Sequence, residues 1–545
     1  MKTRREFLTA ATLTLSASLT KNLYADGHLP QIHTPLPPGA PTVRATLAVS
    51  TNRTHTIPKN FIGLSYESQQ LADPAFFSPK NKQLIAQFKA LSPAGVLRIG
   101  GNTTEFSWWQ PTPAATMPPR PERAAYTGEP TNALSYSITP AAIDNLAKFL
   151  KATGWTCIYG LNLGNGSPAI DADEAAYAAA ALGPHLEYFQ IGNEVDDFGR
   201  HLRDDKTWNS QTYFAEWLAI ARAVTEKVPT AQFGAPDVAS HPGWLTDFAA
   251  SIAATPNPPR IAALTHHHYV GGPPSSPDMT IAHILAGSKA DPAIDKAAAI
   301  AAAATAALNK TQPNTTYRMT EGNTCYRGGK PGVSDVFAAS LWSADYLLHL
   351  ASLGYAGANL HGGDAKAVAN SLGGTLPGEL LMKNPNEPHP KPFYTPIANI
   401  NGTYTAEPVF YGMLFAQQFA GATLLNVDLN ANFTPVNAPG QTGVQPIATA
   451  NATAFAAIRP DGKIIIAIIN KDVTNDLILR VTGAYPASVL RLSASAPDAR
   501  DVTFAHATVT ENGLWDPKPE SAVVYLGRNA PIRIPKTSAV LLVSH

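Results

Sequence analysis

Apolar, strand-like segments alternate with helical segments from residue 61 to about residue 400. The eight predicted strands lie at residues 61–68, 95–101, 156–164, 186–194, 231–238, 261–269, 315–323 and 354–363. Eight strands that alternate with helices are typical of a (β/α)8 barrel. An open doubly wound sheet is the alternative, and it is disfavoured because no GxGxxG motif follows the first strand.

The pattern changes beyond residue 400, where one more helix near 408–420 is followed by short, closely spaced strand-like segments. Pro460-Asp461-Gly462 separates two of them as a hairpin turn would. We predict an all-β sandwich here, and the strand-like segment 42–50 is expected to join it. The predicted division is an N-terminal extended segment at 26–60, a barrel at 61–400, and the last barrel helix with the sandwich at 401–545.

The first 25 residues resemble a twin-arginine export signal, with Arg4-Arg5 ahead of Phe7-Leu8, a modest apolar stretch and Ala25. Such a signal predicts a bacterial protein whose mature form is periplasmic or secreted. The alternative is a merely basic N-terminus.

Charge and cysteine content narrow the possible partners. The 40 basic and 40 acidic residues balance, and no run of like charge would attract nucleic acid or a membrane surface. We therefore expect neither as a partner. Only Cys157 and Cys325 occur, too few for a disulfide framework or a thiolate metal site, and both are expected to be free.

Two predicted strands end in a glutamate: Glu194, directly after Asn193, on the fourth strand, and Glu321 on the seventh. The carboxyl ends of barrel strands meet at one rim, where barrel enzymes keep their reactive groups. Hydrolysis of a glycosidic bond needs two such groups, one to protonate the leaving oxygen and one to attack the sugar or activate water. A single glutamate would more often cap a strand or pair with an arginine, but two at one rim favour a facing pair.

Three successive histidines, His266, His267 and His268, lie in the sixth predicted strand. Side chains of neighbouring strand residues point in opposite directions, so the three rings cannot converge on one zinc ion. We predict core positions or a substrate contact for them, and no metal.

Several segments together resemble glycoside hydrolase family 79, the β-glucuronidases and heparanases of the large retaining clan of (β/α)8 glycosidases. Within residues 43–425 they are FIGLSYESQQLADP, LSPAGVLRIGGNTTEFSWW, GNE, THHHYVGG and TEGNTCYRGG. The resemblance implies that Glu194 is the acid/base and Glu321 the nucleophile. It also implies that Asn193 hydrogen-bonds the sugar 2-hydroxyl and that Tyr269 donates to the nucleophile.

The resemblance further implies a pocket for the C6 carboxylate of a uronic acid, an anion that is costly to bury without partners. Tyr326 and the backbone of Gly328 are its candidate ligands, and an ordinary glycine turn is the alternative. A further tyrosine is expected there, and Tyr394 and Tyr411 are the candidates.

Three more residues are expected to contact sugar hydroxyls: Glu67 on the first strand, and Asn102 and Thr103 after the second. Heparanases have an aspartate near the first position, where this chain has Tyr66-Glu67-Ser68.

These features predict a retaining exo-β-glucuronidase that works by double displacement without a cofactor. Its substrate would be an oligosaccharide, polysaccharide or glycoside that contains glucuronic acid. A heparanase-like endo-enzyme is disfavoured because the rim loops lack clustered lysines and arginines. A sugar-binding protein on a degenerate barrel would be expected to lack one carboxylate, and the tyrosine–glycine loop disfavours an enzyme for neutral sugars.

Overall fold

The computed structural model describes residues 42–119, 134–287, 291–370, 391–433, 448–482, 487–520 and 531–545. The predicted export signal at residues 1–25 lies outside these ranges. Among the helices in the described ranges, none combines the length and the apolar character that a membrane crossing requires.

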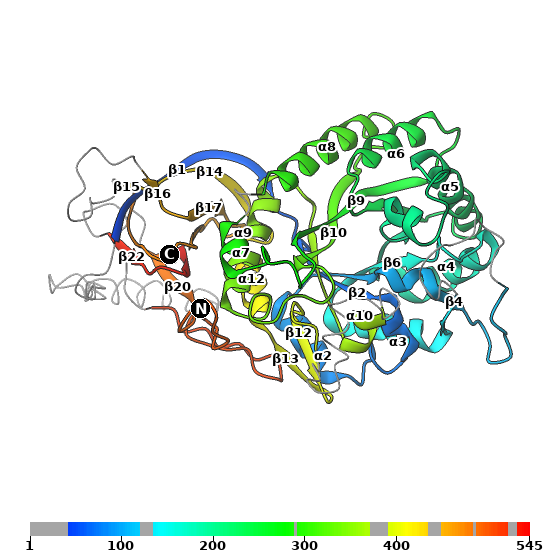
Figure 1. The fold of residues 1–545 in the computed structure, drawn as a ribbon, viewed down its shortest axis with the longest axis horizontal. Coiled ribbons are helices and arrows are strands. Elements are labelled where there is room, and N and C mark those ends of the chain that lie inside the picture. Colours follow the sequence, from blue (N-terminus) through cyan, green and yellow to red (C-terminus); the bar gives the residue numbers. More distant parts are fainter. Residues whose placement is uncertain are drawn as a thin grey trace, which may run out of the picture.

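Eight parallel strands close into a barrel in the order β10-β11-β2-β3-β6-β7-β8-β9 (Figure 1). They are β2 (Ile62–Glu67), β3 (Val96–Gly100), β6 (Thr156–Leu161), β7 (Leu186–Ile191), β8 (Gln232–Val238), β9 (Arg260–Gly271), β10 (Thr316–Cys325) and β11 (Ala358–Gly362). Each overlaps one of the eight strands that the hydrophobic pattern predicts. The (β/α)8 prediction is confirmed.

Helices surround this barrel (Figure 1). They are α2 (Lys82–Leu91), α3 (Pro140–Thr153), α4 (Pro168–Leu182), α5 (Ser210–Lys227), α6 (Gly243–Ala254), α7 (Ile281–Ala286), α8 (Pro292–Leu308), α9 (Phe337–Ser352), α10 (Ala365–Asn370) and α12 (Pro408–Gln417). The Thr139 side chain caps α3 by accepting from the Ala142 amide, and Gly154 ends it at φ 80°. A hydroxyl cap, a first-turn proline and a left-handed glycine are the expected helix boundary signals.

The rim carries elements that the pattern does not predict. The 3-10 helices η2 (Asn102–Phe106) and η4 (Val195–Arg200) follow β3 and β7. Two small ribbons pair β4 (Ser107–Trp109) with β5 (Tyr136–Ile138), and β12 (Ile397–Ile400) with β13 (Thr403–Ala406). These insertions border the rim on which the two glutamates lie.

A nine-stranded sheet lies beside the barrel, in the order β21-β20-β23-β18-β17-β14-β1-β19-β22. Its strands are β1 (Thr42–Thr56), β14 (Thr423–Asn430), β17 (Ala452–Ile458), β18 (Ile464–Asn470), β19 (Asp476–Thr482), β20 (Ala487–Ser493), β21 (Thr503–Phe504), β22 (Ile532–Ile534) and β23 (Ser538–Ser544). A separate small ribbon joins β15 (Asn432–Phe433) to β16 (Ala448–Thr449). The N-terminal strand β1 pairs with β14 and β19, so the strand that precedes the barrel is an inner strand of this sheet.

The two faces of this sheet bury different cores. On β18, Ile466 and Ile468 belong to a core formed within the β domain. Ile465 and Ile469 point the other way and join the core of the barrel and its helices. Figure 1 shows α7, α9 and α12 between the sheet and the barrel. Strand alternation thus makes one apolar strand serve both the sandwich-like domain and the interface.

A buried ion pair crosses that interface. Lys471, directly after β18, contacts Asp345 of α9 at 2.5 Å, and the two side chains are 1% and 0% exposed. The Thr453 hydroxyl also donates to Asp345, at 2.6 Å. Removing one partner leaves an uncompensated buried charge, which is far more costly than losing a surface pair.

Lys471→Met is therefore expected to lower the free energy of unfolding by about 3–5 kcal/mol, measured by urea denaturation. The matched control is Lys227→Met, which removes an exposed ion pair to Asp173. It should change the free energy of unfolding by less than about 1 kcal/mol. Equal losses in the two variants would contradict the assignment.

Candidate active site

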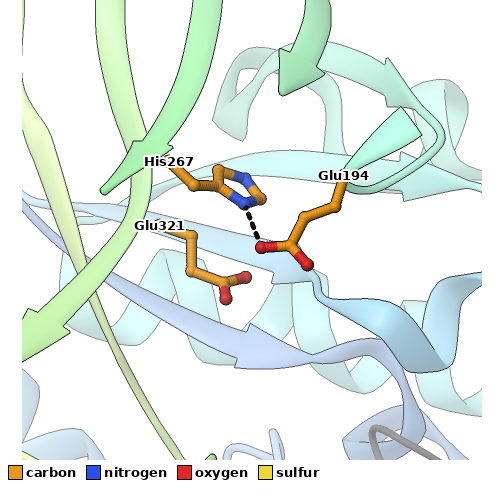
Figure 2. A group of neighbouring side chains, drawn as sticks. All are labelled: Glu194, His267 and Glu321. Carbon is orange, nitrogen blue, oxygen red and sulfur yellow. Dashed lines mark hydrogen bonds and ion pairs between the residues drawn. The ribbon is translucent and has the colours of Figure 1, made fainter. Parts of the chain in front are cut away.

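Glu194 and Glu321 face each other at the carboxyl end of the barrel (Figure 2). A carboxylate oxygen of each and a ring nitrogen of His267 all lie within 4.8 Å of one another. Glu321 follows a register shift between β10 and β9, where Met319 pairs with His266 and Glu321 with His267. The extra residue, Thr320, re-aims the strand as a β-bulge does, and brings Glu321 beside His267.

Glu194 lies beyond the strand that was expected to carry it. The fourth predicted strand extends to residue 194, but β7 ends at Ile191. Gly192 has φ 87° and Glu194 has φ 49°, both in the left-handed region. A non-glycine residue held there marks backbone strain, which commonly accompanies functional positions. This turn carries the Glu194 side chain over the rim.

Arg98 of β3 is fully buried and connects the groups around the site. Each of its terminal nitrogens lies 2.6 Å from a carboxylate: Nη1 from Glu321 and Nη2 from Asp237. Its other donations reach the Asn193 side chain at 2.6 Å, Gln190 at 2.9 Å and Ser65 at 3.1 Å. The planar guanidinium thereby orients both the nucleophile candidate and the residue before the acid candidate.

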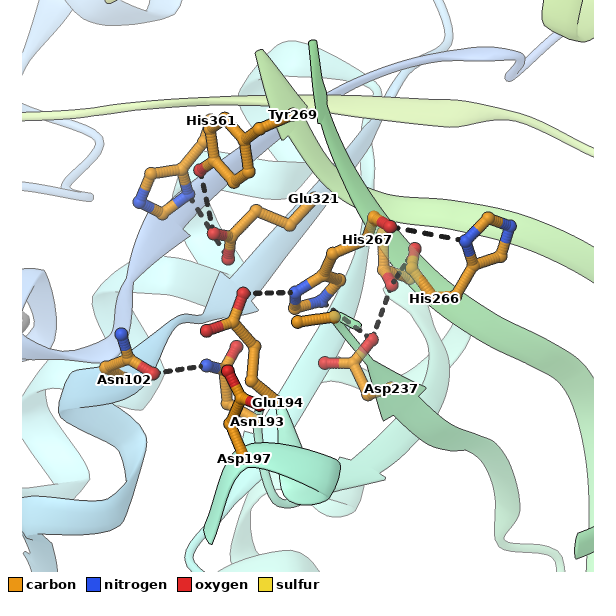
Figure 3. Close-up of polar contacts among 12 residues, drawn as sticks. Asn102, Asn193, Glu194, Asp197, Asp237, His266, His267, Tyr269, Glu321 and His361 are labelled. Atoms are coloured by element: carbon orange, nitrogen blue, oxygen red, sulfur yellow. Dashed lines mark hydrogen bonds and ion pairs between the residues drawn. The ribbon is translucent and has the colours of Figure 1, made fainter. Parts of the chain in front are cut away.

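His267 bridges two carboxylates (Figure 3). Its Nδ1 lies 3.2 Å from Glu194 Oε1. Its Nε2 lies 3.0 Å from Asp237 Oδ1, a close ion pair. Burial lowers the pKa of His267, but the carboxylates of Asp237 and Glu321 outweigh it and raise the pKa to about 10. The ring is therefore an imidazolium at neutral pH.

The pKa values of Glu194 and Glu321 are shifted in opposite directions. Burial would raise the pKa of Glu321, but the positive charges of His361, His267 and Arg98 lower it to about 2. Burial raises the pKa of Glu194 above its ordinary value, against the bond to His267 and with the help of Glu321. Opposite pKa shifts in a facing pair of carboxyl groups assign the ionised state to one, here Glu321, and the proton to the other, here Glu194.

Charge balance supports the same assignment. Four carboxyl groups (Glu67, Glu194, Asp237, Glu321) and three basic groups (Arg98, His267, His361) are linked by contacts at this rim. With both histidines protonated, protonation of Glu194 would leave three negative and three positive charges. A buried network is least costly when its charges cancel.

The other predicted polar residues lie close by. Asn193 donates to Asn102 at 2.7 Å while its oxygen accepts from Arg98. Thr103 donates to Glu67 Oε2 from both its amide, at 3.0 Å, and its hydroxyl, at 2.7 Å. Glu67 is only 2% exposed, so its carboxylate organises the rim instead of being open to solvent.

The predicted aromatic residues form one wall. Tyr269 donates its hydroxyl to Glu321 Oε1 at 2.8 Å. The Tyr326 ring packs edge-on against Tyr269 at 6.2 Å between centroids, and the Tyr394 ring lies 6.4 Å from Tyr269. The Gly328 carbonyl accepts from the Phe393 amide at 2.8 Å, which ties the glycine loop to the segment that carries Tyr394.

Tyr411 lies elsewhere. Its hydroxyl accepts a hydrogen bond from the Val509 amide at 3.1 Å, between α12 and the β domain. Of the two tyrosine candidates, only Tyr394 adjoins the site.

The three histidines diverge, as strand alternation predicts. His267 points into the site, His266 bonds the Tyr355 hydroxyl at 2.7 Å, and His268 pairs with Asp291 at 2.6 Å. Glu194, His267 and Glu321 have metal-like spacing, and a metal ion there would have to displace the proton of His267. Both cysteines are free and buried.

Sequence reasoning missed Arg98, Asp237 and His361 as site residues. Each lies in or at the carboxyl end of a barrel strand and is no more than 2% exposed. The sequence signal that could have found them is a charged or titratable residue within an apolar strand. Such a residue is rarely buried unless it is paired, so it indicates a polar partner inside the barrel.

The chain is similar in sequence to two fungal β-glucuronidases. It is 26% identical over 308 residues to one from Aspergillus niger, a match that covers 54% of this chain and 55% of the relative. It is 25% identical over 361 residues to one from Neurospora crassa, covering 59% and 61%. The chain thus spans little more than half the length of these relatives. No protein-family model matches the chain.

Solved glycosidases share the fold. A 4-O-α-L-rhamnosyl-β-D-glucuronidase from Fusarium oxysporum superposes with a TM-score of 0.63 at 17% identity, covering 92% of this chain and 100% of that one. A family 51 α-L-arabinofuranosidase from Bifidobacterium longum superposes with a TM-score of 0.60 at 13% identity, covering 92% and 100%. These likenesses support the barrel with its added β domain.

Proposed function

We propose that this protein is a retaining exo-β-glucuronidase of glycoside hydrolase family 79. The observation that carries the proposal is the facing pair of Glu194 and Glu321, with oxygens within 4.8 Å and opposite pKa shifts. Retaining glycosidases hold their carboxyl groups about 5–5.5 Å apart, whereas inverting enzymes need a wider gap for water. The sequence similarity to β-glucuronidases points to the sugar.

The reaction takes place in two displacements. Ionised Glu321 attacks the anomeric carbon while Glu194 gives its proton to the leaving oxygen, so the aglycone leaves as an alcohol and a glycosyl ester forms on Glu321. Glu194, now anionic, removes a proton from water, which attacks the same carbon and releases the sugar and Glu321. His267 stabilises the carboxylate that Glu194 becomes between the steps.

The neighbourhood of the nucleophile suits a uronate. Tyr326, Tyr394 and the glycine loop lie on the Tyr269 side of Glu321, with hydroxyl and amide donors of the kind that receive a carboxylate. Asn193 keeps a second side-chain hydrogen for the sugar 2-hydroxyl. The even overall charge agrees with release of single terminal residues rather than with cutting inside a polyanion. Export by the predicted signal would bring the enzyme to glycans outside the cytoplasm.

The test compares p-nitrophenyl β-D-glucuronide with the matching β-glucoside. We expect the wild-type kcat/KM to favour the glucuronide by at least about 100-fold, since buried groups built to bind a carboxylate are left unpaired by the glucoside. Tyr394→Phe should reduce that ratio by roughly 10-fold or more, the effect of one hydrogen bond to a charged group. Tyr411→Phe, away from the site, is the matched control and should leave the ratio unchanged.

A preference for the glucoside would contradict the uronate pocket and leave the glycosidase assignment standing. Turnover of neither aryl glycoside would favour endo-action or a sugar-binding protein.

A further inference from the structure

His361 lies at the carboxyl end of β11, beside Glu321 (Figure 3), and its ring is placed between two carboxylates of the site. Its Nδ1 is 3.5 Å from Glu321 Oε2 and its Nε2 is 3.3 Å from Glu67 Oε1. The ring is 2% exposed. Nothing in the proposed two-step reaction assigns it a role, yet it contacts the nucleophile candidate directly.

Two carboxylates on one buried ring favour its protonated state. A neutral imidazole has one N–H and one lone pair, so one of the two carboxylates would face a lone pair. A protonated ring presents an N–H to each. Ser65 Oγ, which accepts from Arg98 at 3.1 Å, lies 2.9 Å from Nδ1, and this hydrogen bond can form with either protonation state of the ring.

We propose that His361 is protonated in the resting enzyme and acts as a positioning residue that, anchored by Glu67, holds Glu321 ionised and oriented. The proposal rests on the proposed role of Glu321 as nucleophile. It extends that role by assigning Glu67 to His361 instead of to a sugar hydroxyl. Glu67 is itself fixed by the two donations from Thr103, so the chain of contacts runs from η2 to the nucleophile.

The groups that face His361 come from four segments. Glu321 of β10 and Glu67 of β2 are negative, and Arg98 of β3 is positive. The Tyr394 ring packs against it at 5.8 Å between centroids. Burial lowers the pKa of His361, but Glu321 and Glu67 prevail over burial and Arg98 and raise it above the ordinary value. Among the charges that lower the pKa of Glu321, His361 contributes most.

The direct test is NMR of the wild-type protein with isotope-labelled histidine, the His361 signals being assigned by their loss in His361→Gln. We expect the ring to titrate above the ordinary histidine pKa of about 6.5. Glu67→Gln should lower its titration midpoint by about one unit or more, because an opposing charge at this range is worth that much. A ring that is neutral at about pH 6 in the wild type would overturn the proposal.

The kinetic test is the pH dependence of kcat/KM. Its acid limb, where activity falls as pH falls, reports ionisation of the nucleophile in the free enzyme. In His361→Gln, which keeps an N–H donor but not the charge, this limb should move up by about one pH unit or more. His268→Gln is the matched control, because the His268 ring contacts Asp291 and not Glu194 or Glu321. Glu67→Gln combined with His361→Gln should move the limb no further than His361→Gln alone.

An unmoved acid limb in His361→Gln, with activity lost at every pH, would reduce His361 to a packing residue and overturn the proposal. The limb is measured with whichever aryl β-glycoside the wild type cleaves. A wrong sugar would therefore contradict the proposed function without affecting this result, and the NMR test needs no substrate.

Discussion

Glu321→Ala is expected to lower kcat on aryl β-glucuronides by roughly 10⁴- to 10⁶-fold, the range seen when a residue that acts in a covalent catalytic unit is removed. The carboxylate it deletes is the group that would form the glycosyl ester, and Tyr269, Arg98 and His361 would be left facing an empty position. Initial rates on p-nitrophenyl β-D-glucuronide measure the loss. Glu187→Ala, at the opposite end of β7, is the matched control and should retain activity.

Azide distinguishes the two glutamates by the stereochemistry of its product. In Glu194→Ala, azide attacks the glycosyl ester from the face that the leaving group vacated, so the product is the β-azide. In Glu321→Ala, azide replaces the missing nucleophile on the other face, so the product is the α-azide. Proton NMR of the products shows which forms. An α-azide from Glu194→Ala, or wild-type hydrolysis with inversion, would contradict the double displacement.

Arg98→Met is expected to have the largest combined effect on stability and activity. The substitution leaves Asp237 and Glu321 without their shared cation inside the barrel, and breaking a buried pair in this way costs about 3–5 kcal/mol. Activity should be lost as well, because one of the charges that keep Glu321 ionised and the anchor of Asn193 disappear together. Urea denaturation and initial rates measure the two effects.

The controls for Arg98 separate its charge from its shape. Arg98→Lys keeps a positive charge but not the fork that reaches two carboxylates and an amide, so it should recover stability only in part and little activity. Arg200→Met removes an arginine whose side chain is 71% exposed and should cost less than about 1 kcal/mol. Wild-type stability and activity in Arg98→Met would contradict the network.

Local patterns were sufficient for the fold and for the two glutamates. Buried strands are apolar runs of limited length, and amphipathic helices with caps separate them, so the order of elements can be predicted from neighbours in the chain. Glu194 and Glu321 were identifiable because parallel strands end at one rim. Even there, the position of Glu194 was approximate, since the left-handed turn at Gly192 and Glu194 follows a strand that ends at Ile191.

The sequence by itself determined a (β/α)8 barrel with an added β domain, a facing pair of glutamates and free cysteines. Only the tertiary structure decided which groups set their protonation: Arg98, His267 and His361 come from three different strands, and their effect depends on separations of a few ångströms in a buried site. The pairing of β1 with β14 and β19 likewise joins segments some 370 and 430 residues apart. Coulombic interactions and strand pairing act through space, so residue order alone does not contain the distances on which they depend.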